Sequence, residues 1–345
     1  MAESLNIAII ADPALPVPPL LYGGIERIID MLIKDLLKRG HTVSLFAHAD
    51  SKTEAQLFPY PGNGVGKINY LKNTWLINKN IYRNNYDIIH SFGRLAYLLP
   101  QLTFQIPKIM SYQRKPTIRQ IQIANRIAKR KTLIFTGCSN YISEQIAPFA
   151  PSYTVYNGVD FKIYDFQETV ATDAPLFFLG RIEPIKGVHI AIEIAKKTKK
   201  ILIIAGNIPS EYTKYFNEEI KPELNDQIIY IGAVNDIQKN ELLGKASALL
   251  MPILWDEPFG IVMAEAMACG TPVIALDRGA VPEIIKDGIN GFICKDIDQC
   301  VNKVIEVHNL NRSAVRNYAM TRFSAKVIAQ NYLELYQEQI LQATR

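Results

Sequence analysis

Apolar residues along the chain follow two alternating patterns, short β-branched runs and longer segments with helical spacing. Short runs predict buried strands, and apolar residues at every third or fourth position predict helices. In the first half we expect a helix, Gly24–Arg39, and strands at Asn6–Ala11, Thr42–Ala47, Asp87–Ser91, Lys108–Tyr112 and Leu133–Gly137. This alternation is typical of a parallel sheet covered by helices on both faces.

The same alternation starts again in the second half. The expected strand and helix pairs are Phe177–Gly180 with Val188–Lys197, Ile201–Gly206 with Glu211–Glu219, Ile228–Gly232 with Ile237–Lys245, Ala248–Pro252 with Phe259–Cys269, and Pro272–Ala275 with a turn. Two such series predict an α/β protein with two tandem Rossmann-like doubly wound domains that face a central cleft.

Three further helical segments close the chain, at Ile297–Val307, Arg312–Arg322 and Ser324–Gln342. The stretch Asp160–Ala174 lacks periodicity and is rich in turn formers, so we interpret it as a linker. We predict an N-terminal Rossmann-like domain over residues 1–160 and a C-terminal one over residues 161–323. A terminal helix over residues 324–345, with one apolar face, is expected to pack back on the first domain.

The length and composition of the chain exclude several classes of protein. The chain has 345 residues, 48% hydrophobic and 21% charged, which excludes a small disulfide-stapled module and wholesale disorder. No apolar run reaches the roughly 18 to 20 residues of a membrane span, and the first residues lack a signal-peptide pattern, so we expect a cytoplasmic protein. Its four cysteines and five histidines show no metal-ligand spacing, and we expect neither a metal nor another cofactor.

Positive charge is concentrated in the first half, where residues 1–160 carry 18 Lys and Arg against 10 Asp and Glu. No acidic residue occurs between Asp87 and Glu144. A helix predicted within this interval carries a basic stripe, made of Arg119, Arg126 and Arg130 with Lys129 and Lys131 beside it. The stripe fits a solvated face, an anionic membrane surface or a lipid diphosphate, and no nucleic-acid-binding motif accompanies it.

The densest candidate for chemistry is the segment from Trp255 to Pro272, just after an apolar strand. Pro258 suits the first position of a helix and Gly270 the position after its end, which puts Glu257 at the helix entrance. The backbone amides of Phe259, Gly260 and Ile261 would add donors there. Glu265 follows eight residues after Glu257, about 12 Å along a helix, so the two carboxylates can contact different parts of one elongated ligand. The alternative is an amphipathic helix with two solvated glutamates.

Two other segments carry groups suited to a phosphate. Arg181 and Lys186 lie in a loop between a strand and a helix, where they suit a diphosphate, with a basic surface loop as the alternative. Gly23 and Gly24 open a helix, which lets backbone amides approach an anion or a sugar. No GxGxxG or Walker sequence occurs, so a nicotinamide dehydrogenase and a P-loop NTPase lose their main support.

Together these residues resemble the motifs of glycosyltransferase family 4, whose members are retaining nucleotide-sugar enzymes of the two-Rossmann GT-B fold. The most specific part is Glu-Pro-Phe-Gly-Ile-Val-Met-Ala-Glu-Ala-Met-Ala-Cys-Gly-Thr-Pro, which starts at Glu257. The resemblance extends over nearly the whole chain, through Tyr22-Gly23-Gly24-Ile25-Glu26-Arg27, Arg39-Gly40-His41, Tyr156-Asn157-Gly158-Val159-Asp160 and Val281-Pro282-Glu283.

The resemblance implies a role for each position. In the second domain, Glu257 with the amides of Phe259, Gly260 and Ile261 would hold the donor sugar. Glu265 would hold the ribose, Arg181 and Lys186 would neutralise the diphosphate, and the base would lie near the Gly232–Val234 loop. From the first domain, Gly23 and Gly24 would approach the phosphate or sugar, and Tyr22 would lie on the acceptor side. The fixed cations make a metal unnecessary.

One segment departs from the family pattern. Ser91 and Phe92 follow His90, where many members carry a second histidine. His90 ends a strand of the acceptor half, where a catalytic and a structural role are both open. Arg94 and Arg114 follow strand ends and are candidates to replace the polar role of the missing histidine.

The resemblance implies an enzyme of carbohydrate biosynthesis that transfers a sugar, with retention and without a metal, from a nucleotide-diphosphate sugar to a hydroxyl acceptor. A UDP-sugar is one donor we consider, and the acceptor is a sugar, a lipid-linked molecule or a small molecule. Peripheral contact with the inner membrane face is a further hypothesis. The alternatives are a nucleotide-sugar epimerase of the same fold and a nucleotide-sugar-binding pseudoenzyme.

Overall fold

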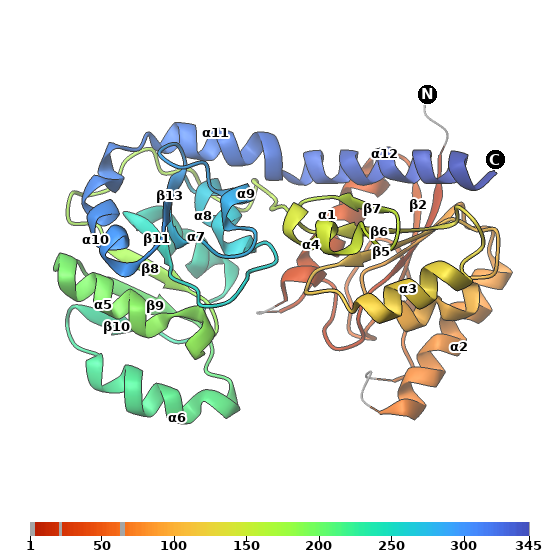
Figure 1. Ribbon diagram of the computed structural model, residues 1–345, viewed down its shortest axis with the longest axis horizontal. Coiled ribbons are helices and arrows are strands. Elements are labelled where there is room, and N and C mark those ends of the chain that lie inside the picture. Colours follow the sequence, from red (N-terminus) through yellow and green to blue (C-terminus); the bar gives the residue numbers. More distant parts are fainter. Residues whose placement is uncertain (1–3, 21–22, 63–65, 345) are drawn as a thin grey trace. The chain divides into compact units, whose positions relative to one another are not determined.

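The computed structural model describes residues 4–20, 23–62 and 66–344, and the chain divides into two compact units (Figure 1). Unit 1 consists of Met1–Asn157 and Ala325–Arg345, and unit 2 is Gly158–Ser324. The last helix therefore belongs to the first unit, although it follows the second in sequence.

Unit 1 is built on a seven-stranded sheet in the order β3-β2-β1-β4-β5-β6-β7, and its neighbouring strands pair in parallel. Its elements are β1 (Asn6–Ile10), α1 (Gly24–Lys38), β2 (Thr42–Ala47), β3 (Gln56–Pro59), α2 (Lys67–Arg83), β4 (Ile88–Ser91), the 3-10 helix η1 (Leu95–Gln101), β5 (Lys108–Tyr112), α3 (Ile118–Ile127), β6 (Leu133–Gly137), α4 (Asn140–Ile146), β7 (Ser152–Thr154) and α12 (Ala325–Thr344).

Unit 2 is built on a six-stranded parallel sheet in the order β10-β9-β8-β11-β12-β13. Its strands and α-helices are β8 (Leu176–Leu179), α5 (Val188–Thr198), β9 (Leu202–Ala205), α6 (Thr213–Tyr215), β10 (Ile228–Tyr230), α7 (Asp236–Lys245), β11 (Ala248–Met251), α8 (Ile261–Ala268), β12 (Val273–Leu276), α9 (Val281–Ile284), β13 (Gly291–Cys294), α10 (Ile297–Glu306) and α11 (Arg312–Phe323). Short 3-10 and π turns occupy Pro184–Lys186, Ser210–Tyr212, Phe216–Ile220, Lys221–Glu223 and Val307–Asn309.

The two sheets confirm the α/β class and the doubly wound topology predicted from the apolar runs. In each sheet the strand order reverses once, between β1 and β4 in unit 1 and between β8 and β11 in unit 2. The carboxyl ends of the strands at such a switch point are where open α/β sheets bind ligands. The loops that follow these four strands are therefore the first places to look for a site.

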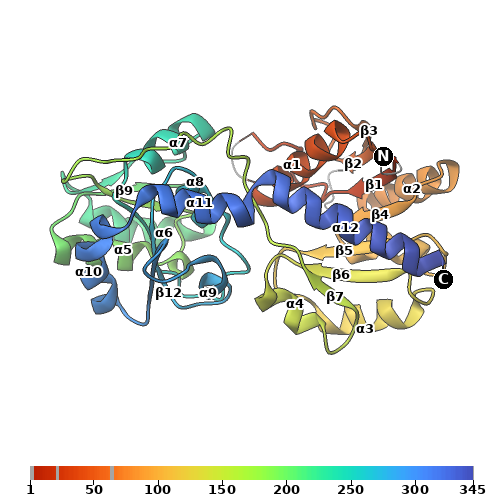
Figure 2. The same ribbon diagram turned by 90° about the horizontal axis from the view of Figure 1, so that it is seen from above.

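Helix α12 is held on unit 1 by specific contacts. Figure 2 shows it running across the strands of this unit, and its buried residues include Tyr332 and Tyr336. The side-chain oxygen of Gln330 accepts a 2.6 Å hydrogen bond from Arg39, which follows α1. The terminal segment therefore packs on the unit formed by the first part of the chain.

The segment predicted as a linker, Asp160–Ala174, is instead packed into unit 2. Tyr164 is buried, the amide of Asp165 donates a 2.8 Å hydrogen bond to Asn240, and Arg316 stacks over the ring of Phe166. The linker interpretation was wrong because a segment without periodicity can still be fixed by side chains from distant helices.

Among the described residues, no helix is both long and apolar enough to cross a membrane.

Candidate functional site

The loops after β8, β11 and β12 meet at the switch point of unit 2, and backbone contacts hold them together. Gly187 caps the loop after β8 at φ 74°, and a Cβ atom there would lie 1.9 Å from the carbonyl oxygen of Pro252. The amide of Leu254 donates a 2.8 Å hydrogen bond to Ile185 in the same loop. The amide of Ala280, beyond β12, donates a 2.9 Å bond to the carbonyl of Glu257. This close approach requires glycine at position 187 and sets Lys186 beside Glu257.

Lys186 and Glu257 form an ion pair at the centre of these loops. The Nζ of Lys186 lies 2.8 Å from Oε2 of Glu257, and the indole nitrogen of Trp255 donates a 3.0 Å hydrogen bond to the same oxygen. The ammonium also lies 4.6 Å from the centre of the Trp255 ring. The two charged side chains are largely but not fully buried, at 19% and 12% exposure, so a ligand from solvent can reach them.

Arg181 forms a second ion pair in the loop after β8. Its guanidinium lies 2.8 Å from the carboxylate of Glu183, whose side chain is almost fully buried. The two cations predicted to bind a diphosphate are therefore on the same loop, and each has a glutamate as its counter-ion.

Glu265 projects from α8 into a buried polar cluster. Its Oε1 accepts hydrogen bonds from the Tyr164 hydroxyl at 2.7 Å and from the Lys239 ammonium at 2.5 Å. Lys239 comes from α7, and Tyr164 comes from the segment interpreted as a linker. Neither Lys239 nor Tyr164 is predicted from the sequence as part of the site. A lysine on the buried side of α7 was the one available signal.

The start of α8 corrects the predicted helix. The helix begins at Ile261, with Gly260 as its N-cap at φ 79°, so Pro258 is not at the first helical position. Glu257 thus lies in the loop, and the spacing of about 12 Å between the glutamates, which assumed one continuous helix, does not apply. At the other end, Gly270 confirms the prediction, because its amide bonds to Met267 and the next amide bonds to Ala266.

The side chain of Phe259 belongs to the core rather than to the site. It is buried and packs edge to face on Phe323, with ring centres 5.6 Å apart. Only its backbone can take the role that the resemblance implies.

The Gly232–Val234 loop follows β10 at the same edge of the sheet. The amide of Gly206, after β9, donates a 2.8 Å hydrogen bond to the carbonyl of Gly232. Asn235 caps α7 by a reciprocal hydrogen-bond pair with Gln238. Val234 therefore directly precedes the N-cap of the helix that carries Lys239.

In unit 1, the switch point gathers a different set of groups. Gly23 is the N-cap of α1 and Gly24 its first residue, while Tyr22 lies outside the described residues. Glu26, in the first turn, is buried, and desolvation raises the pKa of its carboxyl, as does the nearby Asp12. Arg94 follows β4 and pairs with Asp12 at 3.5 Å. Arg114 is exposed beyond β5.

His90 is sealed inside unit 1, which favours the structural of the two roles considered for it. Its side chain is fully buried in β4, and its ring nitrogens lie 2.6 Å from the hydroxyls of Tyr336 and Ser111. Desolvation lowers the pKa of this imidazole to about 3. Tyr336 is on α12, so the helix that returns to unit 1 covers the histidine. The contacts of both ring nitrogens thus support a structural role for His90.

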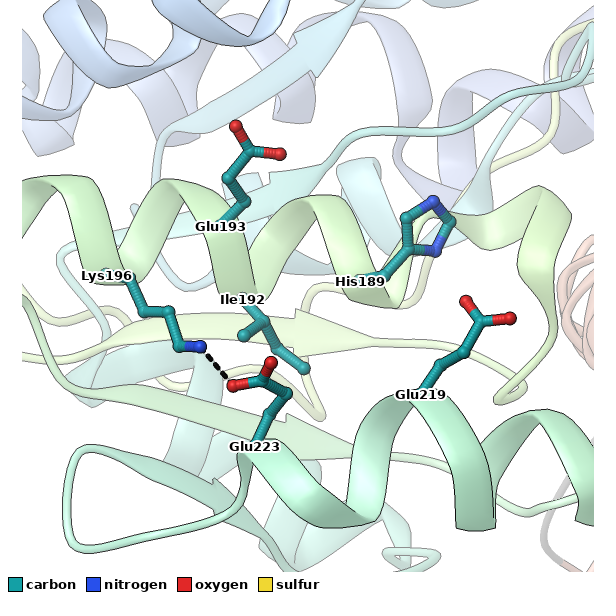
Figure 3. A pocket seen from close by; sticks show the side chains of 6 residues that line it. All are labelled: His189, Ile192, Glu193, Lys196, Glu219 and Glu223. Atoms are coloured by element: carbon teal, nitrogen blue, oxygen red, sulfur yellow. Dashed lines mark hydrogen bonds and ion pairs between the residues drawn. The ribbon is translucent and has the colours of Figure 1, made fainter.

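A cavity of about 220 Å³ lies elsewhere in unit 2, along α5 (Figure 3). Its lining includes three glutamates and one lysine, Lys196, which pairs with Glu223. His189 in this lining is hydrogen-bonded to the hydroxyl of Tyr215 at 2.7 Å. An acidic lining repels a diphosphate, and no predicted site residue contributes to it, so this cavity is not the donor site.

In the part of the chain that the structure describes, no group of three or more His, Cys, Asp and Glu is arranged to hold a metal ion. The four cysteines are buried thiols.

Two doubly wound parallel units are the architecture of GT-B glycosyltransferases, and this chain matches solved structures of that class. Residues 22–162 match the family model Glycosyltransferase Family 4, and residues 160–321 match the model Glycosyl transferases group 1. The chain belongs to glycosyltransferase family 4.

Curated relatives cover almost the full chain at low identity. Spore coat protein SA of Bacillus subtilis is 23% identical over 97% of this chain and 100% of its own. N-acetyl-alpha-D-glucosaminyl L-malate synthase of Bacillus anthracis is 22% identical over 91% of this chain and 93% of its own. The Anabaena protein HepE, solved in complex with UDP-glucose, has a TM-score of 0.74 at 19% identity and covers 97% of this chain and 100% of its own. At this identity the structural likeness establishes the fold.

Proposed function

We propose that this protein is a retaining, metal-independent glycosyltransferase that uses a UDP-sugar as donor and a hydroxyl group as acceptor. The observation that carries the proposal is the Lys186–Glu257 pair, which lies at the switch point with Arg181 on the same loop. A cation and a carboxylate side by side are suited to a ligand in which a diphosphate adjoins a sugar. The complex of HepE with UDP-glucose, a protein of the same fold, supports the choice of donor.

Each of the two glutamates has one carboxylate oxygen that its donors in the fold do not contact. Lys186 and Trp255 both donate to Oε2 of Glu257, which leaves Oε1 to accept a bond from a sugar hydroxyl. Tyr164 and Lys239 both donate to Oε1 of Glu265, which leaves Oε2 for a ribose hydroxyl. Lys186 orients the carboxylate of Glu257 and Lys239 that of Glu265, and the diphosphate would be a second counter-ion for Lys186 and Arg181.

In the proposed reaction, the bond between the anomeric carbon and the diphosphate oxygen breaks, and its electron pair stays on the diphosphate. The acceptor oxygen forms the new bond to the anomeric carbon on the same face of the sugar. The acceptor proton passes to the departing phosphate oxygen, so the products are a nucleoside diphosphate and a glycoside. Lys186 and Arg181 stabilise the charge that grows on the leaving group, which is why no metal is required.

The test combines binding with turnover. A thermal-shift screen against nucleoside diphosphates and their sugars, in EDTA, identifies the donor, because a ligand at 100 times its dissociation constant stabilises the fold by about 2.7 kcal/mol. NMR of the reaction with and without sugar and lipid-linked acceptors then reads the anomeric configuration. Retained configuration with EDTA present supports the proposal. An epimerised donor without acceptor would identify an epimerase, and binding without turnover of any acceptor would identify a pseudoenzyme.

A further inference from the structure

Helix α2 of unit 1 carries an apolar stripe on the side that faces away from the core. Its buried positions are Asn73, Ile77 and Ile81. On the opposite side, Ile68, Leu71, Trp75 and Tyr82 are 60–70% exposed. At 3.6 residues per turn, these four side chains fall within about 60° of one another. Single exposed apolar residues are ordinary, but four large ones aligned on one helix indicate a contact surface.

Cations border this stripe on both sides. Lys72, Lys79 and Arg83 follow it around the helix on one side and Lys67 on the other, and α2 contains no acidic residue. The ammonium of Lys79 lies 4.6 Å from the centre of the Trp75 ring. Over the longer interval of residues 55–143, the chain has 13 Lys and Arg and a single acidic residue, Asp87.

The apolar surface continues past the end of α2. Phe104, which follows η1, is 42% exposed and packs edge to face on Tyr82, with ring centres 5.4 Å apart. Figure 1 shows α2 and α3 on the face of the unit 1 sheet opposite α12. The stripe therefore lies on a side of unit 1 that the C-terminal helix does not cover.

The basic stripe predicted between Thr117 and Arg130 is not formed as expected. Helix α3 ends at Ile127, and Ala128 leaves helical geometry with ψ 139°, so Arg130 lies beyond the helix that carries Arg119 and Arg126. Lys129, Arg130 and Lys131 instead line a cavity of about 240 Å³ before β6. The membrane contact considered from sequence thus loses its geometric basis on α3.

We propose that α2 docks unit 1 on an anionic phospholipid surface. Ile68, Leu71 and Trp75 enter the boundary between headgroups and acyl chains, and Tyr82 with Phe104 extends the contact. The bordering lysines and Arg83 bind lipid phosphates. An amphipathic helix with a bulky apolar side, aromatic residues and flanking cations is the pattern of helices that lie in the membrane interface. The excess of positive charge is complementary to anionic lipid.

The experiment measures flotation of the full-length protein with vesicles of phosphatidylcholine, with and without phosphatidylglycerol. We expect the protein to float with the anionic vesicles, to stay in solution with the neutral ones, and to be released by high salt. Because the chain has two tryptophans, Trp75 can be observed alone in a Trp255→Phe background. Its emission should shift to the blue on anionic vesicles and be quenched by brominated lipid.

Two variants remove the two parts of the surface. Leu71→Ser with Trp75→Ser should abolish flotation, and changing Lys72, Lys79 and Arg83 to Gln should weaken vesicle affinity roughly a hundredfold, at about fivefold for each cation. Matched controls come from exposed positions of unit 2. They are Ile305→Ser, and the triple change of Lys221, Lys286 and Lys295 to Gln, which alters the net charge equally.

Several results would overturn the proposal. Equal flotation of the wild type and the Leu71/Trp75 variant would contradict it. So would an equal loss of vesicle affinity in the α2 charge variant and the unit 2 charge variant, or Trp75 emission that brominated lipid does not quench. A dimer without lipid that Trp75→Ser dissociates, with no vesicle binding, would assign the stripe to a second copy of the chain. Glu257→Gln should leave vesicle binding unchanged, so a failure here is distinguishable from a failure of the proposed reaction.

Discussion

The same topological position holds different chemistry in the two units. At the switch point of unit 2, glutamates hold cations in partly exposed pairs, as in Lys186–Glu257 and Arg181–Glu183. At that of unit 1, the histidine at the end of β4 is fully buried and hydrogen-bonded to hydroxyls. Charged pairs near the surface can exchange a partner for a ligand, whereas a neutral buried network is fixed. The comparison supports our proposal that the donor chemistry resides in unit 2.

The largest effect that tests this comparison comes from the cations of unit 2. We expect Lys186→Ala and Arg181→Ala each to lower turnover by about a hundredfold to a thousandfold, because one lost electrostatic contact to the growing charge costs roughly 2.7–4 kcal/mol. Steady-state kinetics of UDP-sugar consumption, with nucleoside binding as the reference, measure this.

The matched control is Lys221→Ala, at an exposed lysine of the same unit. Donor turnover at the wild-type rate in both site variants would reject the assignment of the diphosphate to this loop. Because Lys186 and Glu257 are in contact, Lys186→Ala combined with Glu257→Gln should cost less than the sum of the single changes.

A smaller effect is expected for a change at Glu265, where the loss of UDP affinity should depend on the ribose hydroxyls. Removing a hydrogen bond to a charged group costs about 1.5–3 kcal/mol, so Glu265→Gln should weaken UDP binding roughly tenfold to a hundredfold. Calorimetry with UDP and with its 2′,3′-dideoxy analogue tests the contact directly. The wild type should lose affinity for the analogue, and the variant should bind both ligands alike. A variant that still prefers UDP would place the ribose elsewhere.

The buried histidine of unit 1 makes a prediction about pH. The folded-state pKa of His90 is lowered to about 3 from 6.5, so below pH 6.5 the unfolded chain binds a proton that the folded unit does not. The free energy of unfolding should therefore decrease as the pH is lowered, by about 2 kcal/mol from pH 7 to pH 5. Urea unfolding followed by Trp75 emission in a Trp255→Phe background reports on unit 1. His90→Gln should remove this slope, and His308→Gln, at an exposed histidine, should keep it. An equal slope in both variants would contradict the buried, neutral state of His90.

How far the sequence predicts this structure depends on how local the signal is. Strands such as Thr42–Ala47 and Lys108–Tyr112 were predicted to the residue, because buried parallel strands are short apolar runs with clear ends. Helix α2 was missed, because its exposed side is apolar and its core side includes Asn73, which reverses the usual helical pattern. The exposed apolar side of α2, which obscured the helical pattern, is also the surface that we propose to bind a membrane.

The candidate site shows the same limit. Its residues on the motifs, such as Lys186, Glu257 and Glu265, could be named from the sequence. Their partners could not, because Tyr164 and Lys239 lie 101 and 26 residues from Glu265 and meet it only in the fold. The position of His90 under α12 depends on a contact 246 residues away, with Tyr336. Contacts of this range leave no periodic trace in the sequence.

The smallest effect is expected at the arginines of unit 1. Arg94 is half exposed and its pair with Asp12 is long, at 3.5 Å, so Arg94→Gln should change stability by less than about 1 kcal/mol. If unit 2 alone carries the donor chemistry, Arg94→Gln and Arg114→Gln should leave the rate of acceptor-independent donor hydrolysis within about twofold of wild type. The loss of one contact to the growing charge, as in Lys186→Ala, would lower that rate by about a hundredfold or more. With a hydroxyl acceptor present, the same variants should raise the acceptor KM several-fold, because each removes a donor beyond the end of β4 or β5. Hydrolysis reduced as strongly as in Lys186→Ala would show that unit 1 also supplies charge to the leaving group, and the contrast between the two switch points would fail.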